Sequence, residues 1–194
     1  MAFRSGQLFA PADFKNEEKY VEMQRMRYAA IASLAIVKKR DANISVPSMV
    51  KSVEVAMNLA KEGSDNPWVL WVDDKANNNI YEREALSSIG ISFILAETTE
   101  YALEVLEDRK FAAIISDMDR PDSNRSGYIL LDTIRERGDT TPLFFYARGG
   151  WKPQYQLETL KHRGQGCTND GQKLFEMITG TVFGGVSTNN RLAA

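Results

Sequence analysis

The chain has 194 residues, of which 43% are hydrophobic and 26% are charged. This length suits one domain with an appendage, and the composition is typical of a globular protein that buries a core. Because 24 Lys and Arg residues face 26 Asp and Glu residues, the net charge of -2 gives no overall attraction to nucleic acid, and we expect no nucleic-acid partner.

The cysteine and hydropathy patterns indicate a cellular compartment. Cys167 is the only cysteine, which excludes an intrachain disulfide and favours a small buried thiol in a reducing environment. The N-terminus has no apolar core typical of a signal peptide. The longest apolar stretch, residues 28–37, is interrupted only by Ser33 and is far shorter than the ~20 residues that a membrane span needs. We therefore expect a cytoplasmic protein with no membrane span.

The N-terminal third of the sequence predicts helices rather than a second α/β unit. Residues 1–13 mix Gly, Pro and isolated aromatics and are expected to form an arm, and residues 14–63 are expected to form a helical extension. In its first piece, residues 16–39, the run YAAIASLAIV is apolar on nearly all sides and requires burial. The second piece, residues 46–61, carries one apolar face at helical spacing, formed by Val46, Met49, Val53, Met57 and Ala60. Such a helical hairpin must pack on its own domain, on another copy of the chain or on a partner, and the sequence leaves these alternatives open.

From residue 67 onward, short apolar runs alternate with amphipathic stretches. In chain order we predict the strand WVLWVDD, a helix over 78–89, a strand over 92–95, a helix over 99–108, the strand FAAIISD, a helix over 128–137, the strand PLFFYA, a helix over 154–162, a strand over 166–168 and a helix over 171–178. Five such units predict an α/β domain over residues 67–179, a flavodoxin-like five-stranded parallel sheet of order 2-1-3-4-5 with helices on both faces. Residues 180–194 are expected to form a flexible C-terminal tail.

Three acidic residues follow two of these strands. Asp73 and Asp74 close the first strand and Asp117 closes the third. In the order 2-1-3-4-5 these strands are neighbours, so the carboxylates are expected to meet at the edge where open parallel sheets bind ligands. Close carboxylates repel one another unless a cation intervenes, and Mg²⁺ prefers such oxygen ligands. With Mg²⁺ present, one of these carboxylates could act as a nucleophile toward a phosphoryl group.

The runs WVLWVDD, IISDMDRP, SGYILLDTIR, TPLFFYA and GQGCTND, within this alternation, resemble the receiver domain of two-component response regulators. The resemblance covers about residues 67–179. It implies that Asp73 and Asp74 hold Mg²⁺, that Asp117 is the phosphoacceptor, and that Asp119 offers its backbone carbonyl to the metal. Pro121 and Gly127 match the proline and glycine of the family's loop.

The chain departs from the family at the positions that respond to phosphorylation. Where receivers carry Thr or Ser after the fourth strand, this chain has Ala147, which has no hydroxyl. Where they carry Lys and Pro after the fifth strand, it has a stretch that includes Asn169 and Asp170. The aromatic switch residue of the fifth strand is also missing. Basic residues near the acids offer substitute cations, namely Lys75, Arg120 and Arg148. We therefore interpret the chain as an atypical receiver, or pseudo-receiver.

These features predict a signalling or interaction module without its own output domain, rather than an enzyme. The expected partners are proteins, such as a sensor kinase in a phosphorelay or a subunit of an assembly, and a second copy of the chain bound through residues 14–63. Atypical, Mg²⁺-dependent phosphorylation at Asp117 is the expected chemistry. The alternative is a Mg²⁺-dependent phosphoryl-transfer enzyme that uses Asp117 as its nucleophile.

Overall fold

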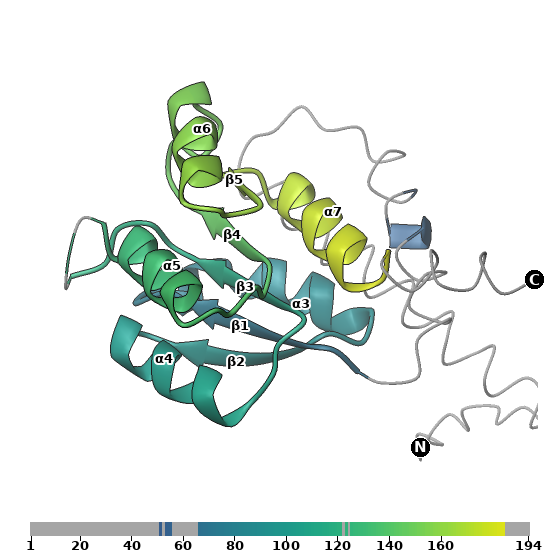
Figure 1. Cartoon of the computed structure of the whole chain (residues 1–194). Helices are drawn as coiled ribbons and strands as arrows, with labels where there is room; N and C mark the ends of the chain where they lie inside the picture. Colours follow the sequence, from purple (N-terminus) through teal and green to yellow (C-terminus); the bar gives the residue numbers. More distant parts are fainter. Residues whose placement is uncertain (1–50, 52, 56–65, 122, 124, 185–194) are drawn as a thin grey trace, which may run out of the picture.

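The computed structural model describes residues 51, 53–55, 66–121, 123 and 125–184 (Figure 1). The strands are β1 (Trp68–Val72), β2 (Ser92–Ala96), β3 (Ala113–Ser116), β4 (Leu143–Tyr146) and β5 (Gly166–Thr168). The helices are the 3-10 turn η1 (Ala76–Asn79), α3 (Ile80–Ser88), α4 (Thr99–Asp108), α5 (Ser126–Glu136), α6 (Pro153–Lys161) and α7 (Gly171–Val182). The strands form one parallel sheet of order β2-β1-β3-β4-β5, which confirms the predicted flavodoxin-like topology.

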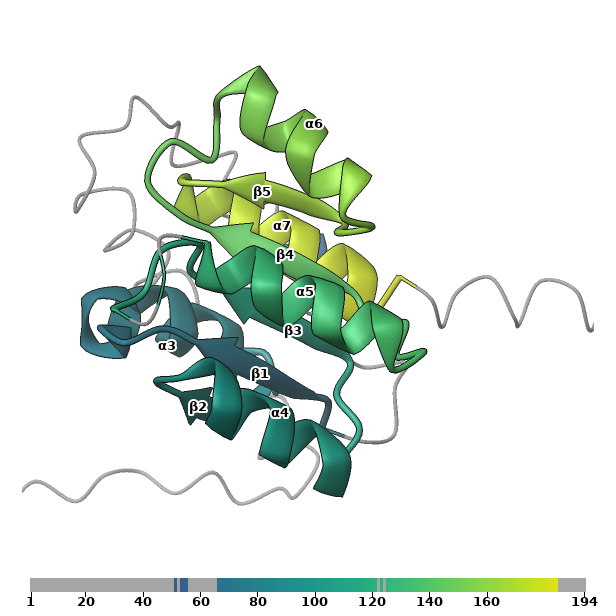
Figure 2. The same cartoon turned by 60° about the vertical axis from the view of Figure 1, so that its left-hand side comes forward.

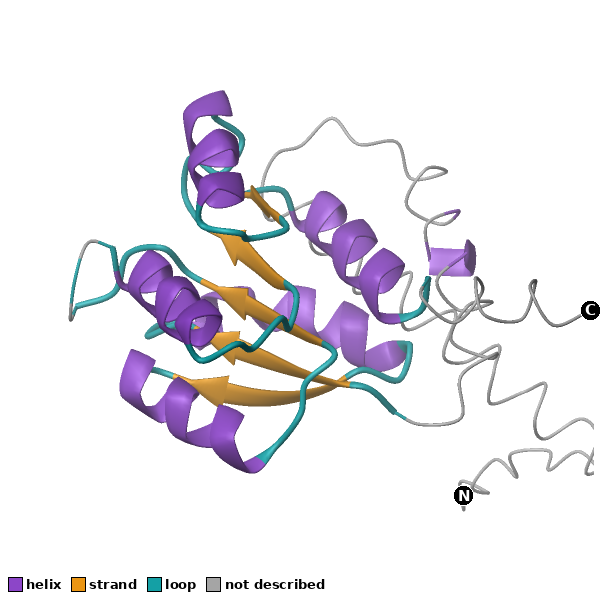
Figure 3. Ribbon diagram, viewed as in Figure 1, coloured by secondary structure: helices purple, strands orange, loops and turns teal. Residues whose placement is uncertain are grey.

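Helices cover both faces of the sheet, as Figures 2 and 3 show. Alternate residues of β1 point to opposite faces, because the side-chain period of a strand is two. Val69 and Trp71 enter an apolar cluster with residues of α3 and α7. Leu70 and Val72 enter a second cluster with residues of α4 and α5. A strand that is buried on both faces is apolar at nearly every position. This is why β1 and β4 are continuous apolar runs and β3 is apolar up to its last residue, Ser116.

The helix boundaries follow local capping chemistry. Thr98 caps α4 by accepting a hydrogen bond from the backbone N–H of Tyr101 (3.2 Å), and the helix has the predicted bounds. At the C-terminal end of the domain, α7 continues to Val182, one turn beyond the predicted Ile178. The extra turn packs because Phe183 joins the same apolar cluster as α7.

The register of β1 and β3 brings the acidic residues that follow these strands to the same edge of the sheet. β1 is the point at which the strand order reverses, since β2 lies on one side of it and β3 on the other. Val72 is level with Ser116, the last residue of β3. The next residues, Asp73 and Asp117, therefore leave the sheet side by side, and the backbone N–H of Asp117 donates to the carbonyl of Val72 (2.9 Å).

Most of the predicted arm, helical hairpin and tail lies outside the described residues. The described part of the second predicted helical piece, residues 51 and 53–55, is helical. Within it, Val53 is 3% exposed and belongs to the apolar cluster that contains Trp71, Leu86 and Phe175. At this turn the chain packs on its own α/β domain. No helix among the described residues is long and apolar enough to cross a membrane.

We expect Val53→Asp to destabilise the domain by roughly 3 kcal/mol, because it places a charge in an apolar cluster. Val55 provides the matched control, since it lies in the same turn and is 51% exposed. Val55→Asp should change the free energy of unfolding by less than about 0.5 kcal/mol. Urea unfolding of both variants measures the difference, and equal effects would show that Val53 does not pack as described.

Candidate functional site

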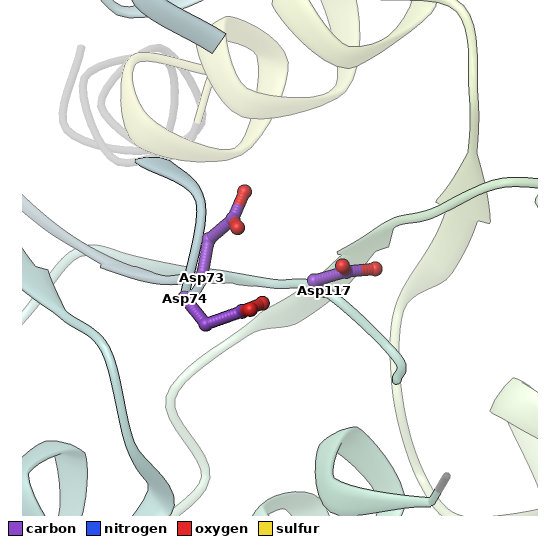
Figure 4. A group of neighbouring side chains, drawn as sticks. All are labelled: Asp73, Asp74 and Asp117. Carbon is purple, nitrogen blue, oxygen red and sulfur yellow. The ribbon is translucent and has the colours of Figure 1, made fainter. Parts of the chain in front are cut away.

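Three carboxylates converge where β1 and β3 end (Figure 4). Asp73, Asp74 and Asp117 each place one carboxylate oxygen so that all three atoms lie within 4.8 Å of one another. Asp73 is buried, whereas Asp74 and Asp117 are half-buried. The predicted acidic residues are thus brought together, and the parallel register of β1 and β3 is the reason.

Backbone and amide donors fix the orientation of two of the acids. One oxygen of Asp73 accepts a hydrogen bond from the backbone N–H of Lys75, and the other accepts one from the Nδ2 of Asn79, both at 2.7 Å. The Oδ1 of Asp117 accepts a hydrogen bond from the backbone N–H of Met118 (2.7 Å). A carboxylate has about four lone-pair sites, so each of these groups keeps the capacity to bind a cation.

The surroundings of Asp117 disfavour its charged form. Burial raises the pKa of the Asp117 carboxyl above its ordinary value, and the negative charges of Asp73, Asp119 and Asp74 raise it further. The Met118 N–H opposes this shift in pKa but does not cancel it. The site therefore carries excess negative charge, which a bound cation would relieve.

The donor set suits a hard divalent cation. Carboxylate and carbonyl oxygens are the ligands that Mg²⁺ prefers, and it commonly binds through one or two carboxylates and retained water. Asp73, Asp74 and Asp117 supply carboxylates, and Asp119 lies two residues after Asp117 on the rim of the same hollow. The residues present thus fit the group that the sequence predicts.

A half-open hollow of about 390 Å³ lies over the acidic edge. Its lining mixes both signs of charge and consists of Asp73, Lys75, Asn78, Asn79, Asp117, Asp119, Tyr146, Ala147 and Arg148. The Nζ of Lys75 lies 3.6 Å from Asp74, and its side chain is 73% exposed. Of the three basic residues proposed as substitute cations, Lys75 and Arg148 line the hollow.

The third basic residue, Arg120, is not among the residues that line the hollow. Arg120 is 4% exposed, and its guanidinium donates to Ser116, to the carbonyl of Asp117 and to Thr99. The sequence indicated only a basic residue in a polar loop and gave no signal for this burial.

The two altered switch positions have different surroundings. Ala147 follows β4, lines the hollow and donates its N–H to the carbonyl of Thr168 (3.0 Å). Asp170 is the N-cap of α7, where its side chain accepts a hydrogen bond from the N–H of Lys173 (2.8 Å). Asp is a favoured N-cap, so this carboxylate has a local structural use.

Sequence reasoning did not find two further pairs at this edge. Asn79 orients Asp73, but in the sequence it is one of three successive asparagines with no distinguishing pattern. Tyr146 donates its hydroxyl to Glu82 of α3 (2.7 Å), and both side chains are buried. Neither residue of that pair carries a local signal, since they are 64 positions apart in the chain.

The glycine predicted from the family's loop has a steric reason. A Cβ at Gly127 would lie 2.6 Å from a ring carbon of Phe145 and 2.8 Å from the carbonyl oxygen of Asp117. Any larger residue would push the segment that carries Asp117 away from the sheet. The first turn of α5 thus approaches the acidic edge as closely as the chain permits.

We expect Asp117→Asn to raise the melting temperature at pH 7 in the presence of a chelator. Because folding raises the pKa of Asp117, the acid stabilises the fold below its ordinary pKa, and this contribution is lost as the pH rises through the folded-state value. A neutral amide avoids the penalty at pH 7, so the gain should shrink toward about pH 4.

Melting curves of Asp117→Asn at the two pH values check this prediction. Glu104→Gln is the control, since it removes the same charge from an exposed position on α4. A variant that is less stable than the unaltered chain at pH 7 would contradict the electrostatic interpretation.

The sequence matches no protein-family model and no curated protein. Solved structures resemble the fold. The receiver domain of the Francisella response regulator 1452 has 19% identity and a TM-score of 0.53, over 61% of this chain and 98% of that one. The signal receiver domain of an HD domain-containing protein from Pseudomonas fluorescens Pf-5 has 19% identity and a TM-score of 0.54, over 66% and 96%.

A response regulator receiver domain protein from Methanospirillum hungatei JF-1 is similar to the same extent. It has 17% identity and a TM-score of 0.53, over 63% of this chain and 98% of that one. At such identities the likeness concerns the fold. The sheet order and these neighbours agree, and the α/β domain of this chain has the fold of a response-regulator receiver domain.

Proposed function

We propose that the chain is a receiver-like signalling module that binds Mg²⁺ at Asp73, Asp74 and Asp117 and acts through protein–protein contacts. The observation that carries this proposal is the convergence of the three carboxylates at the switch point of a receiver-type sheet. Open parallel sheets bind their ligands at this edge.

The acidic edge needs a cation more than an ordinary cluster of surface acids does. Asp73 is 4% exposed and is held by two hydrogen bonds, so it cannot turn away from its neighbours. Burial and the charges of its acidic neighbours raise the pKa of Asp117, so its charged form is disfavoured without a cation. In our proposal Asp73 and Asp74 hold the ion, Asp117 completes the set of carboxylates, and the backbone carbonyl of Asp119 faces it.

Asp117 is the proposed phosphoacceptor. Its Oδ1 accepts the Met118 N–H, so we assign the attack on phosphorus to Oδ2. A bond forms between Oδ2 and the phosphorus of a phosphodonor, the bond from phosphorus to the leaving group breaks, and the leaving group departs with its electron pair. When bound, Mg²⁺ offsets the charge on the phosphoryl oxygens.

Cations from the chain itself would support that step. The family's lysine has no counterpart at Asp170, which caps α7. Lys75 and Arg148 line the hollow with Asp117, and we propose that they contact the phosphoryl group in its place. Arginine presents a planar fork that matches phosphate oxygens, which favours Arg148 as the more specific of the two contacts.

The output of this module would be carried by contacts with other proteins. Ala147 has no hydroxyl to follow a phosphoryl group, so the family's usual switch is not expected to operate. We propose a cytoplasmic partner such as a sensor kinase or an assembly subunit. We also propose self-association through residues 14–63, whose first piece is apolar on nearly all sides.

We expect the unaltered chain to bind one Mg²⁺ ion, measured as heat in a calorimetric titration. Asp73→Asn and Asp117→Asn should each weaken binding at least tenfold, because each removes one ligand charge. The matched control is Glu104→Gln, which should bind as the unaltered chain does. A flat titration of the unaltered chain would contradict the proposed metal site.

Incubation with Mg²⁺ and acetyl phosphate tests the phosphoacceptor. We expect intact mass spectrometry to detect one added phosphoryl group, absent in Asp117→Asn, and to show a rate about tenfold lower in Arg148→Ala, the effect of losing one charged contact. If the chain binds Mg²⁺ but gains no mass, Asp117 is not a phosphoacceptor, and the chain is a metal-binding interaction module. Continuous release of phosphate that depends on Asp117 would instead favour the phosphoryl-transfer enzyme.

A further inference from the structure

Arg120 is a charged residue in the core of the loop that joins β3 to α5. It follows Asp117 by three positions in the run DMDRP, yet its side chain is only 4% exposed. Charged side chains are almost never buried to this degree unless polar partners compensate for lost hydration. The partners of Arg120 therefore indicate what its burial accomplishes.

One arm of the guanidinium holds the backbone of the acidic edge. Its Nη1 donates to the Oγ of Ser116 and to the carbonyl oxygen of Asp117, both at 2.9 Å. The Ser116 hydroxyl donates to the same carbonyl (2.8 Å). The peptide unit that follows the proposed phosphoacceptor is thus held by two side-chain donors.

The other arm reaches a different βα unit. The Nη2 of Arg120 donates to the Oγ1 of Thr99 (2.6 Å), 21 residues earlier in the chain. Thr99 is the first residue of α4 and is 6% exposed. Because a guanidinium is planar and rigid, its two arms cannot move independently. The end of β3 and the start of α4 are therefore joined through one inflexible group.

The backbone of Arg120 completes the arrangement. Arg120 and Ser123 form an isolated antiparallel bridge, with N···O distances of 3.3 and 3.0 Å. This turn directs the Arg120 side chain inward and leaves the preceding residue, Asp119, exposed on the rim of the hollow. The position of the Asp119 carbonyl, which we propose as a metal ligand, thus depends on the anchoring of Arg120.

We propose that Arg120 is the positioning residue of the acidic edge and that it couples occupancy of this edge to the start of α4 through Thr99. This inference rests on the proposed binding of Mg²⁺. With an ion bound, a shift of the segment from Asp117 to Asp119 would move the carbonyl that Arg120 holds. The rigid guanidinium would pass this movement to Thr99, so ion binding and the stability of the first turn of α4 would be thermodynamically coupled.

Calorimetric Mg²⁺ titration and amide hydrogen exchange of the full chain, with and without Mg²⁺, test the coupling. In the unaltered chain we expect Mg²⁺ to slow exchange at residues 99–102. Arg120→Lys keeps the charge but loses the fork, so it should weaken Mg²⁺ binding about tenfold and abolish the change in α4. Thr99→Val replaces the hydroxyl with a methyl group of similar size, so it should keep Mg²⁺ affinity within about threefold of the unaltered chain and lose the response of α4.

Arg125→Lys is the matched control, because Arg125 belongs to the same loop but pairs with Glu158 at the surface. It should change neither readout, and circular dichroism of each variant verifies folding. If the unaltered chain binds no Mg²⁺, the proposed function is wrong. If it binds Mg²⁺ while α4 does not respond, or responds equally in Thr99→Val, only the role of Arg120 is overturned.

Discussion

The mutual repulsion of three carboxylates at one sheet edge is the constraint around which this domain is organised. The parallel register puts Val72 level with Ser116, so the acids that follow must emerge together. One carboxylate oxygen of each acid lies within 4.8 Å of the other two, which is short for like charges. Burial raises the pKa of Asp117, and the neighbouring negative charges raise it further. Closely spaced carboxylates are the ligand arrangement that the proposed Mg²⁺ site needs.

The surrounding structure prevents the acids from relaxing away from one another. Asn79 and the backbone of Lys75 hold both oxygens of Asp73 from the η1 side. Arg120 and Ser116 donate hydrogen bonds to the carbonyl of Asp117, and Gly127 allows α5 to approach the same peptide. Pre-organisation of this kind would keep the proposed ligands in place before an ion binds, which would lower the entropy cost of binding.

The sequence predicted the features that depend on hydrophobic periodicity. The strand runs, the bounds of α4 and β5, the sheet order and the burial of Cys167 follow from apolar residues that must be covered. The meeting of Asp73, Asp74 and Asp117 could also be predicted, because strand ends meet once the order is known.

The directions of loop side chains could not be predicted in this way. Arg120 was a candidate substitute cation and is buried. Asp170 stands in the stretch where the family has a lysine, and it caps a helix. Each orientation depends on partners distant in the sequence or on a local backbone angle. Neither produces a periodic pattern of apolar residues that could be recognised in the sequence. The partner of Val53 was undecided for the same reason, since an apolar helix face is equally satisfied by any apolar surface.

The chemistry around Ala147 bears on how such a domain would signal. The methyl group of Ala147 cannot donate a hydrogen bond to a phosphoryl oxygen. The adjacent Tyr146 already donates its hydroxyl to the buried Glu82. Redirecting the Tyr146 hydroxyl toward a phosphoryl group would leave that buried carboxylate without this donor, at a cost of about 1–3 kcal/mol. The β4 end is therefore poorly suited to move. The loop after β3 is joined to the start of α4 by the hydrogen bonds of Arg120, which in our proposal transmit the response to an occupied edge. In this protein the response to an occupied acidic edge is expected at α4 rather than at β4 and β5.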